Sequence, residues 1–366
     1  MHRSTPGFLF LNIGHFLDHF FVLIFATAAL HLTTVWDMSY AELIPYATPG
    51  FIAFAIGAVP AGWLADKWSR EGMMAIFFLG IGVCSMLAGM ANTPLQLAFF
   101  LTLVGTFAAI YHPVGLAMVV EQRDKTGVPI AVNGIFGNMG VASAALLTGV
   151  LMDTAGWRSA FIVPGAISIA VGLLYLLFLY TNPTENRSTA AGSIKTTQAV
   201  KLPRHLLLRI FGIILFTSAV GGLVFQSTTF SLPKVFDEQL ADIAGNTTSI
   251  GSYAFLAFAV ASFAQLVVGH LLDRQSVRSV FAVVAALQAT FFLAMTQLDG
   301  IAALPVAIAF MLFVFGQIPI NDVLIAQFAH SDWRSRAYAL RSIVSFSVMA
   351  SALPLVAWVH GTWGFN

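Results

Sequence analysis

Two short stretches of the 366-residue sequence share one pattern: Gly62-Trp63-Leu64-Ala65-Asp66-Lys67 and, 207 residues later, Gly269-His270-Leu271-Leu272-Asp273-Arg274. Both stretches read Gly-x-Leu-x-Asp-basic, and each follows a long apolar run. Self-similarity at a fixed offset indicates that the chain contains an internal repeat of one structural unit. The same offset places His112-Pro113 beside Pro319-Ile320, so one apolar run in each half carries a proline at a similar depth.

The composition indicates that lipid is the solvent for most of this chain. Hydrophobic residues make up 58% of it and charged residues only 9%, whereas soluble domains have about 45–50% and about 25%. This excludes a water-soluble enzyme and a disordered chain, because too few charges are present to cover a soluble surface. The net charge of +1 offers no basic surface for nucleic acid. The single cysteine, Cys84, excludes an intrachain disulfide.

We expect eleven membrane-spanning helices, because a bilayer core requires about 20 apolar residues in helical form. The first span is not a secretory signal peptide, since His15, Asp18 and His19 interrupt its apolar run and it is too long. The expected spans are Gly7–Leu32, Leu43–Ala65, Gly72–Met90, Pro94–Val120, Val128–Met152, Ser159–Tyr180, His205–Phe230, Ser249–Leu272, Val277–Thr296, Ile301–Phe328 and Ala337–Val359.

The positive residues predict a cytoplasmic N-terminus. Of the 17 Lys and Arg residues, fourteen fall in loops on the side of Met1, Arg158 and Lys234 fall on the opposite side, and Arg341 lies inside a span. Cytoplasmic loops carry such an excess of Lys and Arg. The polar stretch 181–203 is expected to be a cytoplasmic linker between an N-terminal six-helix bundle, 1–180, and a C-terminal bundle, 204–366.

These features resemble the major facilitator superfamily. The Gly-x-Leu-Ala-Asp-Lys-x-x-Arg pattern at 62–70, in a two-fold repeat of six spans, is typical of that family, with departures at Ser69 and Glu71. The resemblance implies an all-α membrane protein of two six-helix bundles, with about eleven spans present and the twelfth missing after Asn366. A weaker likeness to the fosmidomycin-resistance-like efflux branch rests on Gly14-His15-Phe16 and Tyr111-His112-Pro113.

The repeated loop motifs are expected to gate the cytoplasmic side. Gly62 permits a close approach of the second span to a neighbour, and Asp66 can face the N-terminal end of another helix or pair with Arg70. The resemblance implies that Asp66 and Asp273 belong to this gate. The alternative is a solvated loop without a role. The full gating set is Gly62, Asp66, Lys67, Arg70, Gly269, Asp273 and Arg274.

Ionisable residues inside the spans are candidates for handling protons or substrate, because charge in lipid is costly. His15, Asp18 and His19 lie at spacings of three and four, and therefore on one face of the first span. Imidazoles titrate near neutral pH, so a carboxylate beside two of them can hold a proton. The alternative is that both histidines only hydrogen-bond Asp18. His112 is either a ligand or a core histidine bonded to a carbonyl that Pro113 leaves free.

Polar residues of later spans complete the candidate site. Arg341 can pair with Asp322 on the adjacent span, or it can bind a carboxylate or phosphonate on the cargo. Gln226 falls near Asp18 under the 207-residue offset and is expected to line the opposite wall. The full set for proton or substrate binding is His15, Asp18, His19, His112, Asn133, Gln226, Gln317, Asn321, Asp322 and Arg341.

No cofactor or metal is expected. The sequence lacks the Gly-x-x-x-x-Gly-Lys-Ser/Thr loop that binds ATP phosphates. The His15–His19 pair, with a single acidic neighbour in lipid, is a poor metal site. An intramembrane enzyme that uses Asp18 and these histidines, and a non-transporting receptor or assembly protein, are the alternatives from other functional classes.

We therefore expect a secondary transporter, not an enzyme, that moves a small organic or drug-like solute by alternating access. Protons are the expected coupling ion and efflux the expected direction, in a monomer of the bacterial inner membrane. Proton-coupled uptake of a small organic anion is the alternative, favoured by Arg341. The incomplete exporter motif also favours uptake. Gly140 and Gly149 have the spacing with which that motif begins, but the Gly-Pro pair that should follow is absent and Asp153 stands in its place.

Overall fold

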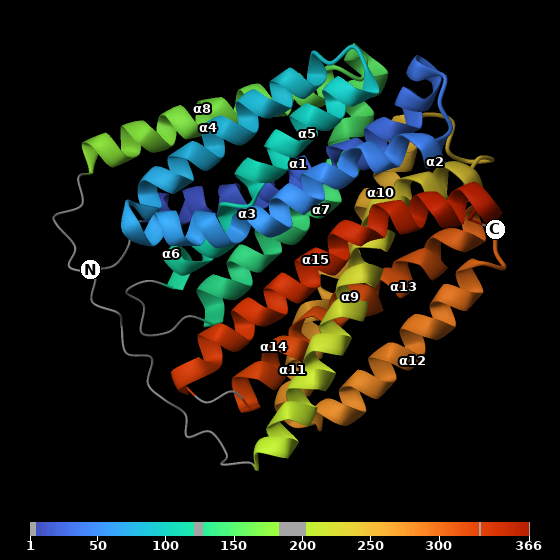
Figure 1. Cartoon of the computed structure of the whole chain (residues 1–366). Coiled ribbons are helices and arrows are strands. Elements are labelled where there is room, and N and C mark those ends of the chain that lie inside the picture. Colours follow the sequence, from blue (N-terminus) through green and yellow to red (C-terminus); the bar gives the residue numbers. More distant parts are fainter. Residues whose placement is uncertain (1–4, 121–126, 183–202, 329–330, 366) are drawn as a thin grey trace. The chain divides into compact units, whose positions relative to one another are not determined.

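The computed structural model describes residues 5–120, 127–182, 203–328 and 331–365, and these residues contain helices but no β-strand (Figure 1). Within these described residues, eleven helical stretches are long and apolar enough to cross a membrane, as the prediction of eleven spans requires. The expected linker, apart from residues 181, 182 and 203, lies outside the described residues. The stretches are Pro6–Trp36, Tyr40–Lys67, Arg70–Gly89, Pro94–Val120, Val128–Ala155, Ser159–Thr181, His205–Gln239, Thr247–Arg274, Val277–Met295, Gly300–Asn321 and Ile343–Trp363.

Several spans consist of more than one helical segment. The elements of the first half are α1 (Thr5–Trp36), α2 (Tyr40–Leu43), η1 (Ile44–Ala47), α3 (Thr48–Lys67), α4 (Arg70–Gly89), α5 (Pro94–Ala108), the π-helix η2 (Tyr111–Gly115), α6 (Leu116–Val120), α7 (Gly127–Ala155) and α8 (Ser159–Thr181). Those of the second half are α9 (Arg204–Gln239), α10 (Thr247–Ser262), α11 (Ala264–Arg274), α12 (Val277–Met295), η3 (Gly300–Ala302), α13 (Ala303–Gly316), α14 (Ile318–Phe328) and α15 (Ser331–Trp363).

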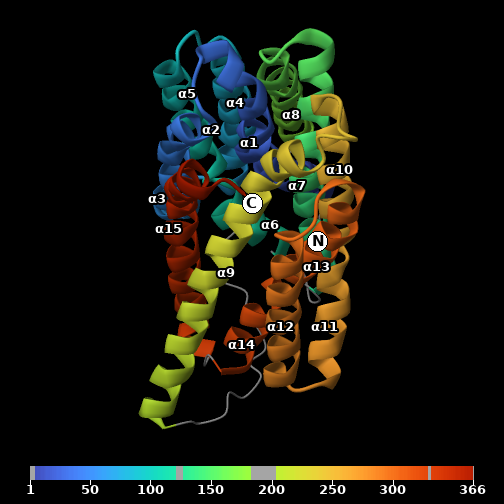
Figure 2. The same cartoon turned by 90° about the vertical axis from the view of Figure 1, so that its right-hand side faces the viewer.

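The helices form two compact units. The first contains α1 to α8 and the start of α10, and the second contains α9, the rest of α10 and α11 to α15. Within the first unit, α1 packs on α7, α4 on α8, and α3 on α5. Within the second unit, α9 packs along α15 and α12 packs on α13 (Figure 2).

Polar side chains at helix starts explain where several spans begin. Ser69 Oγ accepts a hydrogen bond from the backbone N–H of Gly72 at 3.0 Å, and Thr93 Oγ1 accepts one from Gln96 at 3.2 Å. At the start of α2, Ser39 and Glu42 form a reciprocal capping box. Each cap satisfies a backbone donor that the first helical turn leaves without a partner.

Glycines allow two helix pairs of the first unit to approach closely. A Cβ atom on Gly105 of α5 would collide with the backbone of Gly50 in α3. Likewise, a Cβ atom on Gly82 of α4 would lie 2.6 Å from the carbonyl oxygen of Gly165 in α8. Small residues at such crossings let backbones pack together in a membrane, where hydrophobic association between helices is weak.

The seventh span is longer than expected. The sequence predicted an end at Phe230 and placed Lys234 in an outer loop, but α9 continues through Pro233 to Gln239. Lys234 Nζ lies 2.7 Å from Asp237 Oδ2 and 3.3 Å from Glu238 Oε1. These pairs at spacings of three and four stabilise the last turns of the helix.

The fourth and tenth spans are both interrupted where the repeat placed a proline. In the fourth, α5 ends at Ala108 and Tyr111–Gly115 form the π-helical turn η2, which contains Pro113. In the tenth, α13 ends at Gly316 and α14 begins at Ile318, next to Pro319. A proline lacks the N–H of the regular helical bond, and π-turns occur frequently at functional sites.

Candidate functional site

Four ionisable side chains of the first unit gather between α1 and η2. His15, Asp18 and His19 come from α1, and His112 comes from η2. The centroids of the three imidazole rings form a triangle with sides of 5.0, 5.4 and 5.5 Å. His112 Nε2 lies 3.4 Å from Asp18 Oδ2. The structure thus brings the predicted residue of the fourth span to the three predicted residues of the first.

Asp18 is the most buried member of this cluster. Its side chain is 0% exposed, and neither carboxylate oxygen has a hydrogen-bond partner among the described residues. An isolated carboxylate in an apolar interior is costly and is normally paired or neutralised. The carboxylate of Asp18 therefore favours a cation in the space next to the three imidazoles.

A hydrogen-bond network anchors the cluster to α7. His15 Nδ1 lies 2.8 Å from the backbone oxygen of Asn133 and must donate, because a carbonyl oxygen can only accept. Asn133 Nδ2 donates to Tyr111 Oη at 2.9 Å and to Asn12 Oδ1 at 3.0 Å. Tyr111 Oη in turn donates to the backbone oxygen of Leu11 at 2.8 Å. Because these groups are buried, the bonds hold α1, η2 and α7 in one arrangement.

Tyr111 and Gly137 both confine the ring of His15. Tyr111 stacks on it with a centroid distance of 4.8 Å and an interplanar angle of 20°. A Cβ atom on Gly137 would lie 2.6, 2.7 and 2.8 Å from Nε2, Cε1 and Cδ2, and therefore above the ring plane. Nε2 is buried without a hydrogen-bond partner in the described part of the chain. With Nδ1 as the donor, a neutral ring presents an unused lone pair at Nε2.

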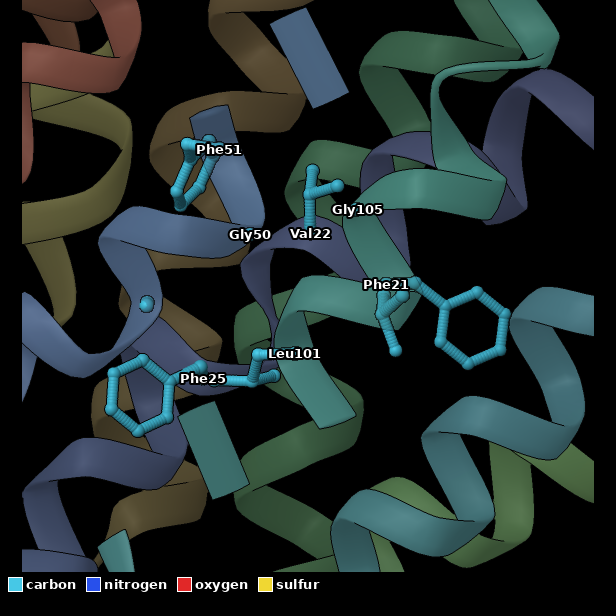
Figure 3. A pocket seen from close by; sticks show the side chains of 9 residues that line it. Phe21, Val22, Phe25, Gly50, Phe51, Leu101 and Gly105 are labelled. Carbon is cyan, nitrogen blue, oxygen red and sulfur yellow. The ribbon is translucent and has the colours of Figure 1, made fainter. Parts of the chain in front are cut away.

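The first unit also contains an apolar crevice (Figure 3). Its lining contains no polar side chain and comes from α1, η1, α3 and α5. Phe51 of this lining lies one turn from Phe54, whose ring meets His112 edge-on at 5.9 Å. The lining residues are Phe21, Val22, Phe25, Ala47, Gly50, Phe51, Leu101, Val104 and Gly105.

The second unit contains a separate polar strip on α9. Thr217 Oγ1 donates to Asn321 Oδ1 at 2.9 Å. One turn further along α9, a Cβ atom on Gly221 would lie 3.6 Å from the side chain of Gln317. Gln317 and Asn321 thus both face α9, although the break between α13 and α14 separates them.

The remaining predicted site residues have different outcomes. Gln226 is 3% exposed, and its Nε2 has no hydrogen-bond partner within the described residues. Arg341 is half-buried in α15. The side chain of Asp322 lies outside the described residues, so its pairing with Arg341 stays a prediction.

The two copies of the gating motif differ in their surroundings. In the first copy, Arg70 Nη2 donates to Asp66 Oδ1 at 2.8 Å, and a Cβ atom on Gly62 would lie 3.2 Å from Pro113 Cβ. In the second copy, nothing lies within 4 Å of such an atom on Gly269. Lys67, Asp273 and Arg274 are exposed. The gating role itself stays a prediction.

Sequence reasoning did not select Tyr111, Asn12 and Gly137 as parts of the site. Asn12 lies three residues before His15, so the helical spacing that selected His15 and Asp18 also included it. Tyr111 directly precedes His112, but its contact with Leu11 requires the packing of η2 on α1. Gly137 has no side chain, so neither charge nor helical spacing could select it.

Comparisons with known proteins identify relatives over most of the chain. The family model described as "Major Facilitator Superfamily" matches residues 10–354. A gallate transporter of Pseudomonas putida is 27% identical over 183 residues, which are 50% of this chain and 40% of that protein. The multidrug resistance protein MdtG of Enterobacter lignolyticus is 26% identical over 232 residues, 61% of this chain and 53% of that protein. The matched region spans about half the length of these curated relatives or less.

A solved structure supports the fold. It is a bacterial homolog of the human lysosomal transporter Spinster, in an inward-facing and occupied conformation. It matches 97% of this chain and 82% of its own, with a TM-score of 0.79 at 15% sequence identity. At this identity the similarity extends to the fold alone.

Proposed function

Because the chain belongs to the Major Facilitator Superfamily, we propose that it is a secondary transporter that exports a small organic or drug-like solute in exchange for protons. It works by alternating access, in which the binding site opens to one side of the membrane at a time. The name of the multidrug resistance relative supports export of such a solute.

The observation that carries the coupling is the placement of Asp18. A fully buried carboxylate without a hydrogen bond is tolerated in lipid when a cation neutralises it. Binding and release of a proton at Asp18 provide the exchange. Asn133 and Tyr111 keep His15 in place on the same face of α1.

The cargo binds partly through apolar contacts. The crevice lined by Phe21, Phe25 and Phe51 offers apolar surface to the cargo, because the side chains of its lining are all apolar. The protein acts as a monomer in the plasma membrane of a bacterium, with its N-terminus in the cytoplasm, as the distribution of Lys and Arg favours.

Transport direction and coupling are tested in inside-out membrane vesicles with an acidic lumen. Export is expected to appear as ethidium accumulation that collapses when nigericin removes the pH gradient. Asp18→Asn is expected to reduce this accumulation at least tenfold. Gradient-independent exchange of labelled for unlabelled solute should persist in the variant, which shows that it still folds and binds. Unchanged gradient-driven accumulation in Asp18→Asn contradicts the coupling.

Uptake of a small organic anion is the second candidate, and Arg341 is the observation that favours it. Arg341 is half-buried in α15, two residues before the apolar stretch that begins at Ile343, and a guanidinium binds carboxylates in a bidentate manner. The gallate transporter among the relatives supports a carboxylate cargo. Right-side-out vesicles with an acidic exterior should then accumulate gallate, and Arg341→Gln should abolish this while Arg341→Lys retains part of it. Equal loss for neutral cargo contradicts this candidate.

A further inference from the structure

We infer that His15, His19 and His112 form a binding site for one divalent transition-metal ion, such as Zn²⁺. The inference goes beyond the proposed function and does not depend on it. One ligand nitrogen from each of the three imidazoles lies within 4.8 Å of the others. The sequence argued against a metal because it offered only the His15–His19 pair, and the structure adds a third imidazole from η2.

The arrangement of the rings fits three imidazoles around one ion. With a Zn–N distance of about 2.1 Å, each ring centroid lies about 3.2 Å from the metal, so tetrahedral geometry separates the centroids by about 5.2 Å. The observed separations are 5.0, 5.4 and 5.5 Å. In tetrahedral geometry the ligand nitrogens lie about 3.4 Å apart, whereas here they lie within 4.8 Å of one another. Side-chain rotations that bring the nitrogens closer together by up to about 1.4 Å therefore complete the site.

His15 already has the surroundings of a metal ligand. A ligating histidine usually donates its other ring N–H to a backbone carbonyl or a carboxylate, which fixes the tautomer and the ring orientation. His15 Nδ1 makes this bond to Asn133 O, while Nε2 has no partner and the whole side chain is 7% exposed. Stacking on Tyr111 and contact with Gly137 hold the ring in place.

Asp18 makes the charge of a dication acceptable at this depth. Neutral imidazoles bring no negative charge, so a bound dication in an apolar interior needs a carboxylate nearby. Asp18 supplies it from the turn between His15 and His19, 3.4 Å from His112 Nε2. Three imidazoles with one carboxylate favour Zn²⁺, Co²⁺ or Ni²⁺, whereas Mg²⁺ and Ca²⁺ prefer oxygen ligands.

Calorimetry with Zn²⁺ on the tag-free protein in detergent tests the site directly, and Co²⁺ absorption reports its geometry. We expect one ion per chain and a tetrahedral Co²⁺ spectrum. His19→Ala and His112→Ala should each lower the affinity at least tenfold. His31→Ala is the matched control, because His31 lies on the same helix and is exposed. An absence of saturable binding, or an unchanged affinity in both cluster variants, overturns the inference.

Two further measurements separate misfolding and transport failure from loss of the site. Zn²⁺ should raise the melting temperature of the wild type and of His31→Ala, but not that of His19→Gln. His19→Gln should itself melt close to the metal-free wild type. The binding assay requires neither solute nor gradient. Proton-driven flux without metal binding therefore overturns the metal site alone, whereas metal binding without flux leaves this site intact and overturns the proposed transport.

Discussion

Gly134, Gly137 and Gly140 occupy successive turns of α7, yet their surroundings differ. A Cβ atom on Gly140 would collide with the backbone of Phe16, and one on Gly137 would lie over the ring of His15. Nothing lies within 4 Å of the corresponding atom on Gly134. The three glycines therefore have different roles despite their common spacing: Gly140 allows close helix packing, Gly137 leaves space for the His15 ring, and Gly134 lies at an open position.

Gly137→Ala and Gly134→Ala form a matched pair for testing the importance of the His15 ring position. Gly137→Ala must displace the ring, so we expect a loss of about 1–3 kcal/mol in stability together with a marked fall in transport. Gly134→Ala should be neutral or stabilising by about 0.5–1 kcal/mol, since alanine favours the helix. Unfolding in detergent and vesicle flux measure both quantities. Equal effects of the two variants contradict the assigned role of Gly137.

Asn133→Ala tests the network that joins α1, η2 and α7. The change removes the amide that donates to Asn12 and Tyr111, and it leaves buried polar atoms without partners. We expect a loss of about 1–3 kcal/mol in unfolding free energy. Asn138→Ala on the same helix is the control, because no side-chain hydrogen bond to Asn138 occurs within the described residues. A loss no larger than that of the control contradicts the structural role of the network.

At the scale of elements, hydropathy predicted the spans well because each helix must cover the same apolar thickness. The seventh span was predicted too short, since the ion pairs of Lys234 that extend α9 depend on helical geometry beyond the apolar run. Helical spacing also predicted that His15, Asp18 and His19 share a face. The approach of His112 could not be predicted in the same way, because it depends on how η2 packs against α1.

Gly105→Val tests the crossing of α3 and α5. The new side chain would collide with the backbone of Gly50, which cannot move without separating the helices. We expect destabilisation of about 1–3 kcal/mol or more from overpacking. Gly212→Val on α9 is the control, because nothing lies within 4 Å of its Cβ position and both variants carry the same change in helix propensity. Similar melting temperatures for the two variants contradict the close crossing.

At the scale of the whole molecule, the second half repeats the helical fold of the first half but not its cluster of ionisable side chains. The 207-residue offset places Gly222, Phe225, Gln226 and Pro319 at the positions of His15, Asp18, His19 and His112, and none of them is ionisable. The second unit instead has the polar strip of Thr217 and Asn321. A duplicated scaffold therefore has one unit suited to cations and one suited to hydrogen bonding.

The orientation of the whole chain can be tested with single cysteines. The only native cysteine, Cys84, is 5% exposed, and Cys84→Ala removes it. Because cytoplasmic loops carry the excess of Lys and Arg, Gln275, which follows Arg274, should face the cytoplasm, and Asp299, one span later, should face outward. Both residues are exposed. A membrane-impermeant maleimide should label Asp299→Cys in intact cells and Gln275→Cys only in inside-out vesicles. The reverse pattern would place the N-terminus outside and would also invert the proposed direction of export.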